Sequence, residues 1–488
     1  MPNRAFRLVR QSPHAASFGT EGANVGISDL AAASRSQFRR SLRLAALASL
    51  TLAASQPAAA QSILRDAETE AMFADMAAPL VKAAGMDPKT VKVVLINDDE
   101  INAFTAGGQT IYVNSGLIAA ADNANQVQGV IAHELGHIAD GHVVLANEGV
   151  RPAMGIQILS IVLGIAAAAA GGGEAAAGIM AAGQQAALGN YLAYSRTTEA
   201  TADATGAKFL REAGITGQGM LDFFKKLQAQ EAYWSATGKL DPFMQNHPLT
   251  GERIADLSAD IQASPAFHTK PDAALNVRFL RVRAKLQGFV APAKDTLGKY
   301  PVSDQSIYAH YARAYAYHKS GFPEQADAEA TALVTAQPDD PYFEEIRGQI
   351  LLEAGRPRDA LAPLRRAVDG SRDAPLIATT LGHALIATED KANYPEAERV
   401  LRVAVARDDD NPFGWYQLGQ VYALQGDDAR AALATAEQAS LTGNTKIAAF
   451  TARNAMAGIP QNSPDWFRAQ DIAMTNQNEL DDGRKHKH

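Results

Sequence analysis

Apolar positions along residues 61–141 predict two helices around a small sheet. Residues 61–90 place methionines, leucines and a valine among polar neighbours, which favours a helix. The β-branched run 91–96 predicts a strand, and a Gly-Gly pair at 107–108 predicts a tight turn into a second strand over 109–113. Residues 125–141 contain no strong breaker and predict the second helix. We expect an antiparallel sheet whose edge strand either holds an extended substrate by main-chain hydrogen bonds or simply supports the helix.

A long apolar segment follows over residues 153–188. Nearly every residue from Met154 to Ala170 is apolar, and an Ala-rich run continues to Leu188 after three glycines and Glu174. Seventeen residues lie at the short limit for crossing a bilayer, and alanine and glycine add little transfer energy. The pattern favours a buried helical hairpin. The alternatives are a segment that contacts a membrane surface or a client protein, and a true membrane span.

The C-terminal part of the chain repeats itself. Gly321 and Gly355 are 34 residues apart, and the last full unit resembles the tetratricopeptide pattern through Pro412, Trp415, Leu418, Gly419, Tyr422 and Ala431. Each helix pair in such a repeat exposes an apolar face that only its neighbours can cover. We therefore expect an α-solenoid over 307–470, with a concave surface that binds peptides or proteins.

The spacing of the repeat predicts the boundaries. We expect units of 307–340, 341–374, 375–411 and 412–445, followed by a cap over 446–470. Proline punctuation followed by an apolar helical run predicts a linker helix over 266–306, and the polar residues 471–488 predict a flexible tail.

The N-terminus has the organisation of a targeting segment. A basic stretch at 38–43 precedes an apolar stretch at 44–54, and three alanines at 58–60 offer a cleavage site. We expect residues 1–60 to be a cleavable signal peptide that exports the chain to the periplasm. The chain contains no cysteine, so disulfides and cysteine metal sites are excluded.

Charge narrows the classes of partner. The formal net charge is −8, and removal of residues 1–60 leaves 38 basic against 51 acidic residues. A polyanion is a poor partner for such a chain, so we expect no nucleic-acid binding.

The strongest chemical signal is the His-Glu-x-x-His motif formed by His133, Glu134 and His137. Two histidines four residues apart lie on one face of a helix, where their imidazoles can converge on one zinc ion. Glu134, beside the first histidine, can then act as the general base for a metal-polarised water. The motif has only three fixed residues and can arise by chance, so the prediction of a zinc site depends on further candidate ligands elsewhere in the chain.

A pair of acidic residues further along the chain provides such candidates. Glu199 and Asp203 are four residues apart, so a helix aims both carboxylates to the same side. A site with two histidines needs one more protein ligand, which Glu199 can provide. Asp203 can hydrogen-bond a ligand histidine and set its tautomer. His142, five residues after His137, is more typical of a solvent or core histidine than of a ligand.

Together these residues resemble the HtpX/CAAX-protease family of zinc endopeptidases. The resemblance lies in His133-Glu-Leu-Gly-His137, in the 195–203 stretch Ser-Arg-x-x-Glu-x-x-x-Asp, and in the Asn-Ala-Phe of 102–104. The 246–254 stretch Asn-His-Pro-Leu-Thr-x-Glu-Arg-Ile resembles the BepA-like members in particular. The similarity covers roughly residues 65–265.

The resemblance implies a site. Zinc, one ion per chain, would be held by His133, His137 and Glu199, with Glu134 as general base and Asp203 supporting a ligand. The BepA-like members imply that His247 can close on the metal and hold the enzyme latent, and that Arg253 lies near the site and stabilises the developing oxyanion. His247 can equally serve only as a residue before a helix, since Thr250 is a good N-cap.

The resulting expectation is a mostly α protein. An α+β zincin-type (gluzincin) peptidase domain over 61–265, with the small antiparallel sheet, precedes the α-solenoid of tetratricopeptide repeats. The family implies a periplasmic endopeptidase for misfolded or misassembled outer-membrane proteins, with the solenoid on the barrel-assembly machinery. The alternatives are a chaperone or adaptor of outer-membrane protein assembly with a latent or vestigial protease site, and a membrane-embedded protease of the HtpX type.

Overall fold

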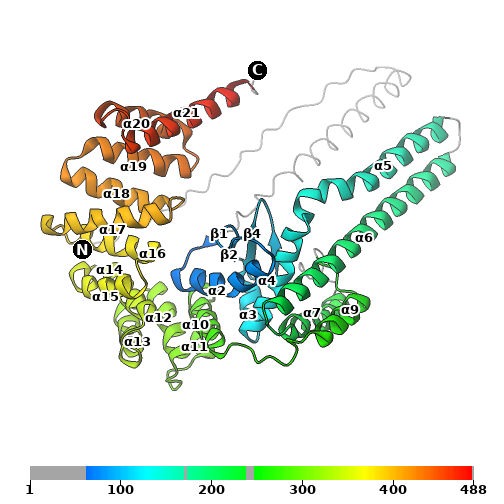
Figure 1. Ribbon diagram of the computed structural model, residues 1–488, viewed down its shortest axis with the longest axis horizontal. Coiled ribbons are helices and arrows are strands. Elements are labelled where there is room, and N and C mark those ends of the chain that lie inside the picture. The colour runs from blue at the N-terminus through cyan, green and yellow to red at the C-terminus, as the bar shows by residue number, and fades with distance from the viewer. Residues whose placement is uncertain (1–61, 170–172, 238–246, 486–488) are drawn as a thin grey trace, which may run out of the picture. The chain divides into compact units, whose positions relative to one another are not determined.

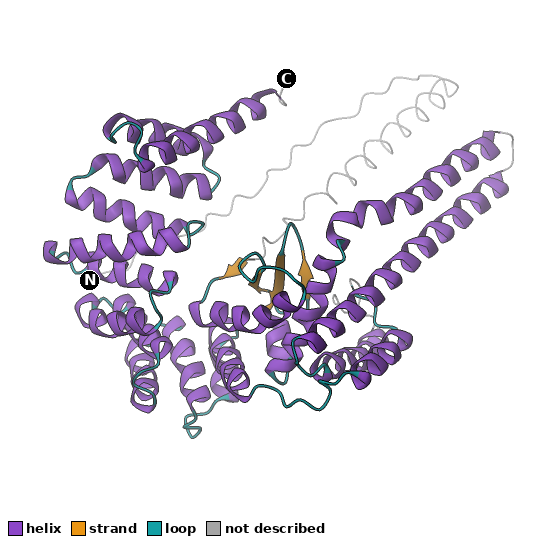
Figure 2. Ribbon diagram, viewed as in Figure 1, coloured by secondary structure: helices purple, strands orange, loops and turns teal. Residues whose placement is uncertain are grey.

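The computed structural model describes residues 62–169, 173–237 and 247–485, and everything said below about structure concerns those residues (Figure 1). The predicted signal peptide, 1–60, lies outside them. The described chain is mostly helical with one small sheet, as expected (Figure 2). The sheet and its helices form an N-terminal part, residues 62–263, and a helical solenoid follows it.

The sheet has four strands in the order β1-β2-β4-β3. They are β1 (Ser62–Leu64), β2 (Lys92–Asn97), β3 (Ala103–Thr105) and β4 (Thr110–Asn114). Gly107 and Gly108, both at positive φ, form the predicted turn between β3 and β4.

The expected antiparallel sheet is wrong in one respect. The two strands predicted from the sequence, β2 and β4, pair in parallel, with Val93 opposite Ile111 and Leu95 opposite Val113. The reason is that β3 lies between them in the chain and reverses direction first, so β4 runs the same way as β2. Strand β1, which pairs antiparallel with β2, falls within the region 61–90 that the sequence predicted as helix.

Helix α4 (Ala124–Ala139) lies at the centre of the N-terminal part. Asn123 caps it by accepting a hydrogen bond from the backbone N–H of Gln126 (3.1 Å), and Gly141, at φ 71°, ends it. Nearly all of α4 is buried, because α2 (Ala67–Ala83), the sheet and two later helices surround it. The other helices are α3 (Ser115–Ala120), α5 (His142–Ala169), α6 (Gly173–Glu212), α7 (Gln218–Thr237) and α9 (Gly251–Ala263).

Helices α5 and α6 form the predicted hairpin, but its large apolar side chains are exposed. Burial was expected because long apolar runs usually lie in a core. Among the described residues, α5 packs mainly on α6, so the side of α5 that faces away from α6 has no protein cover. Within the described residues, no helix has the length and apolar character needed to cross a membrane.

The predicted linker is two helices, α10 (Ala273–Val290) and α11 (Ala293–Lys299). Helix α10 contributes Phe279 and Val282 to the same apolar core as α4, and it packs most extensively on α12, the first solenoid helix. It therefore joins the two parts by packing as well as by sequence.

The solenoid follows the predicted repeat. Its helix pairs are α12 (Ile307–Lys319) with α13 (Pro323–Ala336), α14 (Pro341–Glu353) with α15 (Pro357–Gly370), α16 (Pro375–Ala387) with α17 (Tyr394–Arg407), and α18 (Pro412–Gln425) with α19 (Asp428–Leu441). A short 3-10 helix at Lys391–Asn393 accounts for the longer third unit. Helices α20 (Thr445–Gly458) and α21 (Pro464–Lys485) close the stack.

The predicted flexible tail from 471 is wrong, because α21 continues to Lys485. Ala469, Ile472, Ala473 and Asn476 repeat at helical spacing and are all buried. The side-chain amide of Asn476 also donates a hydrogen bond to Ser440 Oγ (3.0 Å). The segment is polar overall, so this short row of buried positions was not recognised in the sequence.

A buried ionic cluster joins the N-terminal part to the solenoid. Lys285 Nζ on α10 lies 2.7 Å from Asp66 Oδ1 and 3.0 Å from Glu68 Oε2. The hydroxyl of Tyr311 on α12 donates to the same Glu68 oxygen (2.8 Å), and Arg281 Nη2 lies 2.9 Å from the other. Each carboxylate charge is thus balanced where water has little access.

Replacing Lys285 by Met is expected to destabilise the fold by about 3–5 kcal/mol, because it leaves buried carboxylate charge with less compensation. Urea unfolding followed by circular dichroism measures the change. Lys294→Met, at an exposed position of α11, is the matched control. Equal midpoints for the two variants would show that the cluster does not hold the parts together.

Candidate active site

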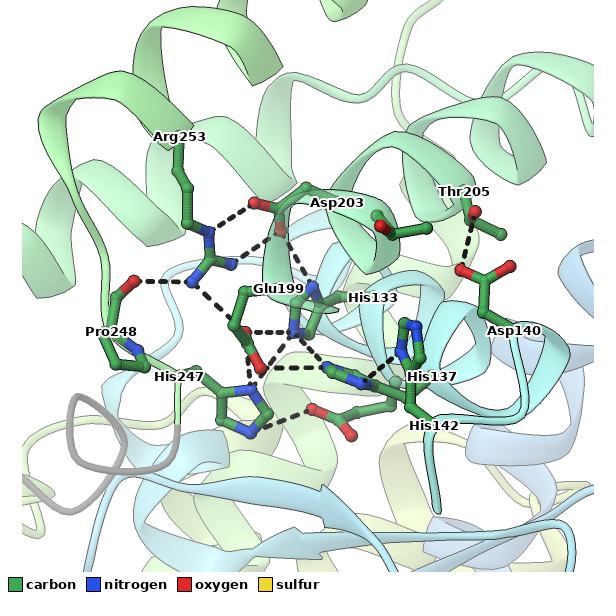
Figure 3. Close-up of polar contacts among 12 residues, drawn as sticks. His133, His137, Asp140, His142, Glu199, Asp203, Thr205, His247, Pro248 and Arg253 are labelled. Atoms are coloured by element: carbon green, nitrogen blue, oxygen red, sulfur yellow. Dashed lines mark hydrogen bonds and ion pairs between the residues drawn. The ribbon is translucent and has the colours of Figure 1, made fainter. Parts of the chain in front are cut away.

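Helix α4 presents the motif residues on one buried surface. His133 and Glu134 are fully buried and His137 nearly so. The Nε2 atoms of His133 and His137 lie 3.2 Å apart, one turn from each other, as the spacing predicts (Figure 3).

Helix α6 brings the two predicted carboxylates to this surface. A Cβ on Gly136 of α4 would lie 2.6 Å from the backbone oxygen of Ala202 on α6, so only glycine permits this close approach. Glu199 Oε1 then lies 3.4 Å from His137 Nε2, and its Oε2 lies 3.4 Å from His133 Nε2. Asp203 Oδ1 lies 2.9 Å from His133 Nδ1, on the other side of that ring.

His247 comes to the same point from a distant segment, just before α9. Its Nδ1 lies 3.0 Å from Glu199 Oε2 and 3.3 Å from His133 Nε2. Its Nε2 faces Glu134 Oε1 at 3.6 Å. Thr250 caps α9 by accepting from the backbone N–H of Arg253 (3.2 Å), so the helix start holds this segment in place.

The arrangement fits a tetrahedral divalent cation. One donor atom from each of His133, His137, Glu199 and His247 can be chosen so that all lie within 4.8 Å of one another. Zinc–nitrogen and zinc–oxygen bonds of about 2.0–2.1 Å place tetrahedral donors about 3.3 Å apart, close to the distances above. Both carboxylate oxygens of Glu134 are buried without a hydrogen-bond partner among the described groups, as a base aimed at a metal site would be.

Burial and neighbouring charges shift the pKa of each of these residues. Burial lowers the pKa of His133, but hydrogen bonds and charge from Asp203 and Glu199 outweigh it and raise the pKa to about 10. Burial and the charge of His133 lower the pKa of His137 to about 2. Burial tends to raise the pKa of Glu199, but the neighbouring histidines hold it well below its usual range. Burial raises the pKa of Glu134, which suits a residue that must take up a proton.

Metal uptake should therefore strengthen as pH rises. Near neutral pH the metal-free His133 carries a proton, since its pKa is about 10, and a cation must displace it. One displaced proton makes the affinity rise roughly tenfold per pH unit between pH 6 and 9. Competition with a chromophoric zinc chelator, corrected for the protonation of the chelator, measures this slope. An affinity independent of pH would contradict the charge assigned to His133.

Arg253 lies in the site, but its guanidinium points at carboxylates. Its Nε and Nη2 donate to the two oxygens of Asp203 (2.7 and 2.9 Å), and its Nη1 donates to the backbone oxygen of Pro248 (2.7 Å). Nη1 also lies 3.2 Å from Glu199 Oε2. These contacts direct the guanidinium at the carboxylates that hold the histidines, whereas the resemblance implied contact with an oxyanion.

The sequence did not predict the contact that His142 makes. Its Nδ1 lies 3.1 Å from Nδ1 of His137, the ring nitrogen that faces away from Glu199. Gly141 lets the chain turn after α4, and α5 begins at His142. A glycine directly before a histidine, at the end of the motif helix, was the available signal. The contact supports the orientation of a candidate ligand without making His142 one.

This fold and donor set define a class: a metallopeptidase in which a His-Glu-x-x-His helix is completed by a glutamate from a later helix. Residues 28–261 match the family described as Peptidase family M48. This part of the chain is a Peptidase M48 domain, and the chain is a metalloprotease, as the motif predicted.

Curated relatives extend beyond this domain. The beta-barrel assembly-enhancing protease of Yersinia pestis is 26% identical over 381 residues, which cover 77% of this chain and 76% of the relative. The protein of the same name from Escherichia coli (strain K12) is 26% identical and covers 72% of this chain and 71% of its own length. Metalloprotease LoiP of the same strain is 31% identical over 172 residues, 34% of this chain and 60% of the relative. The resemblance to BepA-like proteins is thus confirmed.

Among solved structures, YrrB, described as a tetratricopeptide repeat protein with an unusual peptide-binding site, covers 36% of this chain and 91% of its own. The sequence identity is 18% and the TM-score 0.30.

Proposed function

We propose that this chain is a periplasmic zinc endopeptidase that hydrolyses misfolded or misassembled envelope and outer-membrane proteins. Residues 1–60 would direct export. The observation that carries the chemistry is the buried group of His133, His137, Glu199 and His247 next to Glu134. The name of the two long relatives, beta-barrel assembly-enhancing protease, supports the class of client.

The catalytic roles follow from position. Zinc held by His133, His137 and Glu199 would act as a Lewis acid toward water and the peptide carbonyl. Glu134 takes the proton of the attacking water and delivers it to the leaving amine nitrogen, for which its raised pKa is suited. Asp203 accepts a hydrogen bond from Nδ1 of His133, so that Nε2 would be the donor to zinc. Arg253 positions Asp203 and Glu199.

Strand β3 is the candidate support for an extended substrate. It pairs only with β4 in the described sheet, so its outer edge offers backbone groups for pairing. Ala103 of β3 lies in the same buried core as Leu135 of α4, which places this edge beside the motif helix. Main-chain hydrogen bonds would align a peptide with little dependence on its sequence, as a quality-control protease requires.

The solenoid is the candidate docking surface for clients or for the outer-membrane assembly machinery. A cavity of about 580 Å³ lies between strand β1, α10 and the first helices of the repeats. Leu286, Phe289, Leu376 and Phe413 line it, and the Glu345 carboxyl lies at its wall. Burial raises the pKa of that carboxyl to about 8. Charged and amide side chains, among them Arg65, Lys285 and Gln349, also line it. A cavity with both apolar walls and polar groups can anchor a peptide side chain and fix its orientation.

The test uses residues 61–488, purified and analysed for bound metal, with an unfolded outer-membrane protein as substrate. One zinc per chain, with digestion that stops on chelation and resumes on adding zinc, is expected. A chain that binds no zinc would refute the proposal.

A chaperone or adaptor with a latent protease site is the second candidate, and His247 favours it. The imidazole lies close enough to the other three candidate donors that it would bind zinc as a fourth donor and take the place of a reacting water. A site closed in this way would bind metal and client while cleaving slowly.

His247→Ala is expected to raise the rate of digestion on the order of tenfold, the gain for a latch that is closed nine-tenths of the time. Peptide release from unfolded casein measures it, with metal content determined in parallel. His268→Ala, at an exposed position, is the control. A lower rate with normal metal content would make His247 a contributor to catalysis instead.

A further inference from the structure

The α5–α6 hairpin directly follows the motif helix α4, and its second helix, α6, also carries Glu199. Helix α5 starts five residues after His137, and α6 ends beyond Glu199. The two helices run side by side (Figure 1). Glu174 is 25 residues from Glu199, so at 1.5 Å per residue α6 extends about 38 Å from the site.

The contact between these helices is made by small residues. Ser160 and Gly164 of α5 are buried against α6, and so is Gly183 of α6. A Cβ on Gly183 would lie 2.0 Å from the Cβ of Ser160, which shows how closely the helices approach. In a hairpin adapted to water, large apolar side chains would fill this contact.

The large apolar side chains point outward instead. Between 44% and 63% of the surface of each is exposed in the α5 series Met154, Ile158, Leu159, Ile161, Val162, Leu163 and Ile165. Helix α6 adds Met180, Leu188, Tyr191 and Leu192, which are exposed by 37% to 55%. Helices that pack within lipid typically place small residues at their mutual contact and large apolar residues on the surface that faces the lipid.

The direction of these side chains distinguishes lipid from a protein groove. At about 100° per residue, the exposed apolar positions of α5 span about 200° around the helix, centred opposite Ser160 and Gly164. A protein groove typically covers one apolar stripe of about 100°. Hydrocarbon covers every side that α6 does not.

The near absence of charged residues in the hairpin also favours a lipid partner. Glu174 is the only Asp, Glu, Lys or Arg residue between positions 152 and 195. The hairpin therefore lacks the basic residues that draw amphipathic helices to anionic lipid, and apolar area must drive any insertion. Because no described helix is long and apolar enough to span a bilayer, insertion would be from one side.

We propose that the hairpin inserts residues 153–165 and 174–192 into a phospholipid surface and so holds the protease on a membrane. Leu192 is seven residues from Glu199, about 10 Å along α6. The site then lies close above the lipid, where a membrane protein emerges as it inserts. Lipid binding does not require catalysis, so this proposal and the proposed proteolysis can fail separately.

Flotation of residues 61–488 with phosphatidylcholine vesicles tests the proposal. The wild type is expected to float with the vesicles, also in 0.5 M salt, since no basic residue takes part. Ile158→Asp with Ile165→Asp is expected to lower the partition coefficient at least about tenfold, because charge is costly in hydrocarbon. Val302→Asp with Phe450→Asp changes equally exposed apolar residues elsewhere and should float like the wild type.

A label gives an independent readout. The chain has no cysteine, so Leu163→Cys accepts a single environment-sensitive fluorophore. Its emission should shift to the blue when vesicles are added, whereas a label at Val302→Cys should not respond. Bound zinc and casein digestion without lipid should match the wild type in every variant, which shows that each is folded.

Several outcomes would overturn the proposal. Equal flotation of the hairpin and control variants would place lipid binding elsewhere, as would binding that needs anionic lipid and is lost in salt. Absence of flotation by the wild type would exclude a lipid partner. If sedimentation showed a dimer that only the hairpin variant loses, without lipid binding, the covering partner would be a second copy of the chain.

Discussion

Glu134→Gln is expected to lower the rate of peptide hydrolysis by roughly 10²–10⁴-fold, while the bound metal remains at the wild-type level. The amide keeps the shape of the carboxylate but cannot accept the proton of the attacking water. The metal is unaffected, because the candidate donor atoms come from His133, His137, Glu199 and His247, and the Glu134 carboxylate is not one of them.

Single-turnover digestion of a fluorogenic peptide, with metal quantified on the same sample, measures both quantities. Glu212→Gln, an exposed glutamate on α6, controls for the chemical change. Loss of metal from Glu134→Gln would mean that the carboxylate is a ligand. Undiminished hydrolysis would mean that another group is the base.

Glu199→Ala is expected to weaken metal binding by more than about 100-fold and to abolish hydrolysis with it. Removal of a partner that only orients a ligand already costs 10–100-fold, and loss of a ligand should cost more. The effect should be strengthened by charge, since Arg253 Nη1 lies 3.2 Å from the carboxylate oxygen that is removed. The cation would then enter a site with excess positive charge.

Metal analysis after dialysis against a weak chelator provides the test, with Glu212→Ala as the control on the same helix. A Glu199→Ala protein that retains one metal per chain would remove this residue from the ligand set. His247 would then be the obvious third ligand, and the combined substitution with His247→Ala would be expected to lose the ion.

Much of the solenoid could be predicted because its order is local. Gly321 and Gly355 both adopt positive φ at the ends of helices, one repeat apart, as their spacing implied. Each repeat packs on its neighbours in sequence, so a pattern of about 34 residues contains most of the contacts. The exception is α21, where four buried positions within a polar segment were too few to predict a packed helix.

The candidate metal site could be predicted only in part, because only some of its contacts are between residues close in the sequence. The position of His133 beside His137 follows from helix geometry alone. The helical spacing of Glu199 and Asp203 made them candidates, whereas only the resemblance to known peptidases suggested that His247 lies at the metal site. No local pattern indicated that Arg253 would face Asp203, since this contact depends on how α9 meets α6. The glycine before His142 was the one local sign that His142 would contact His137.

The sequence by itself determined the motif helix, the repeat and the class of chemistry, since these depend on residues within one or two turns or one repeat. Only the tertiary structure decided how the sheet pairs, where the Arg253 guanidinium points, and that the apolar hairpin is exposed. Those outcomes depend on contacts between distant segments. The hairpin shows this most clearly: an apolar run specifies that water is unfavourable around it, but only packing decides whether protein covers it.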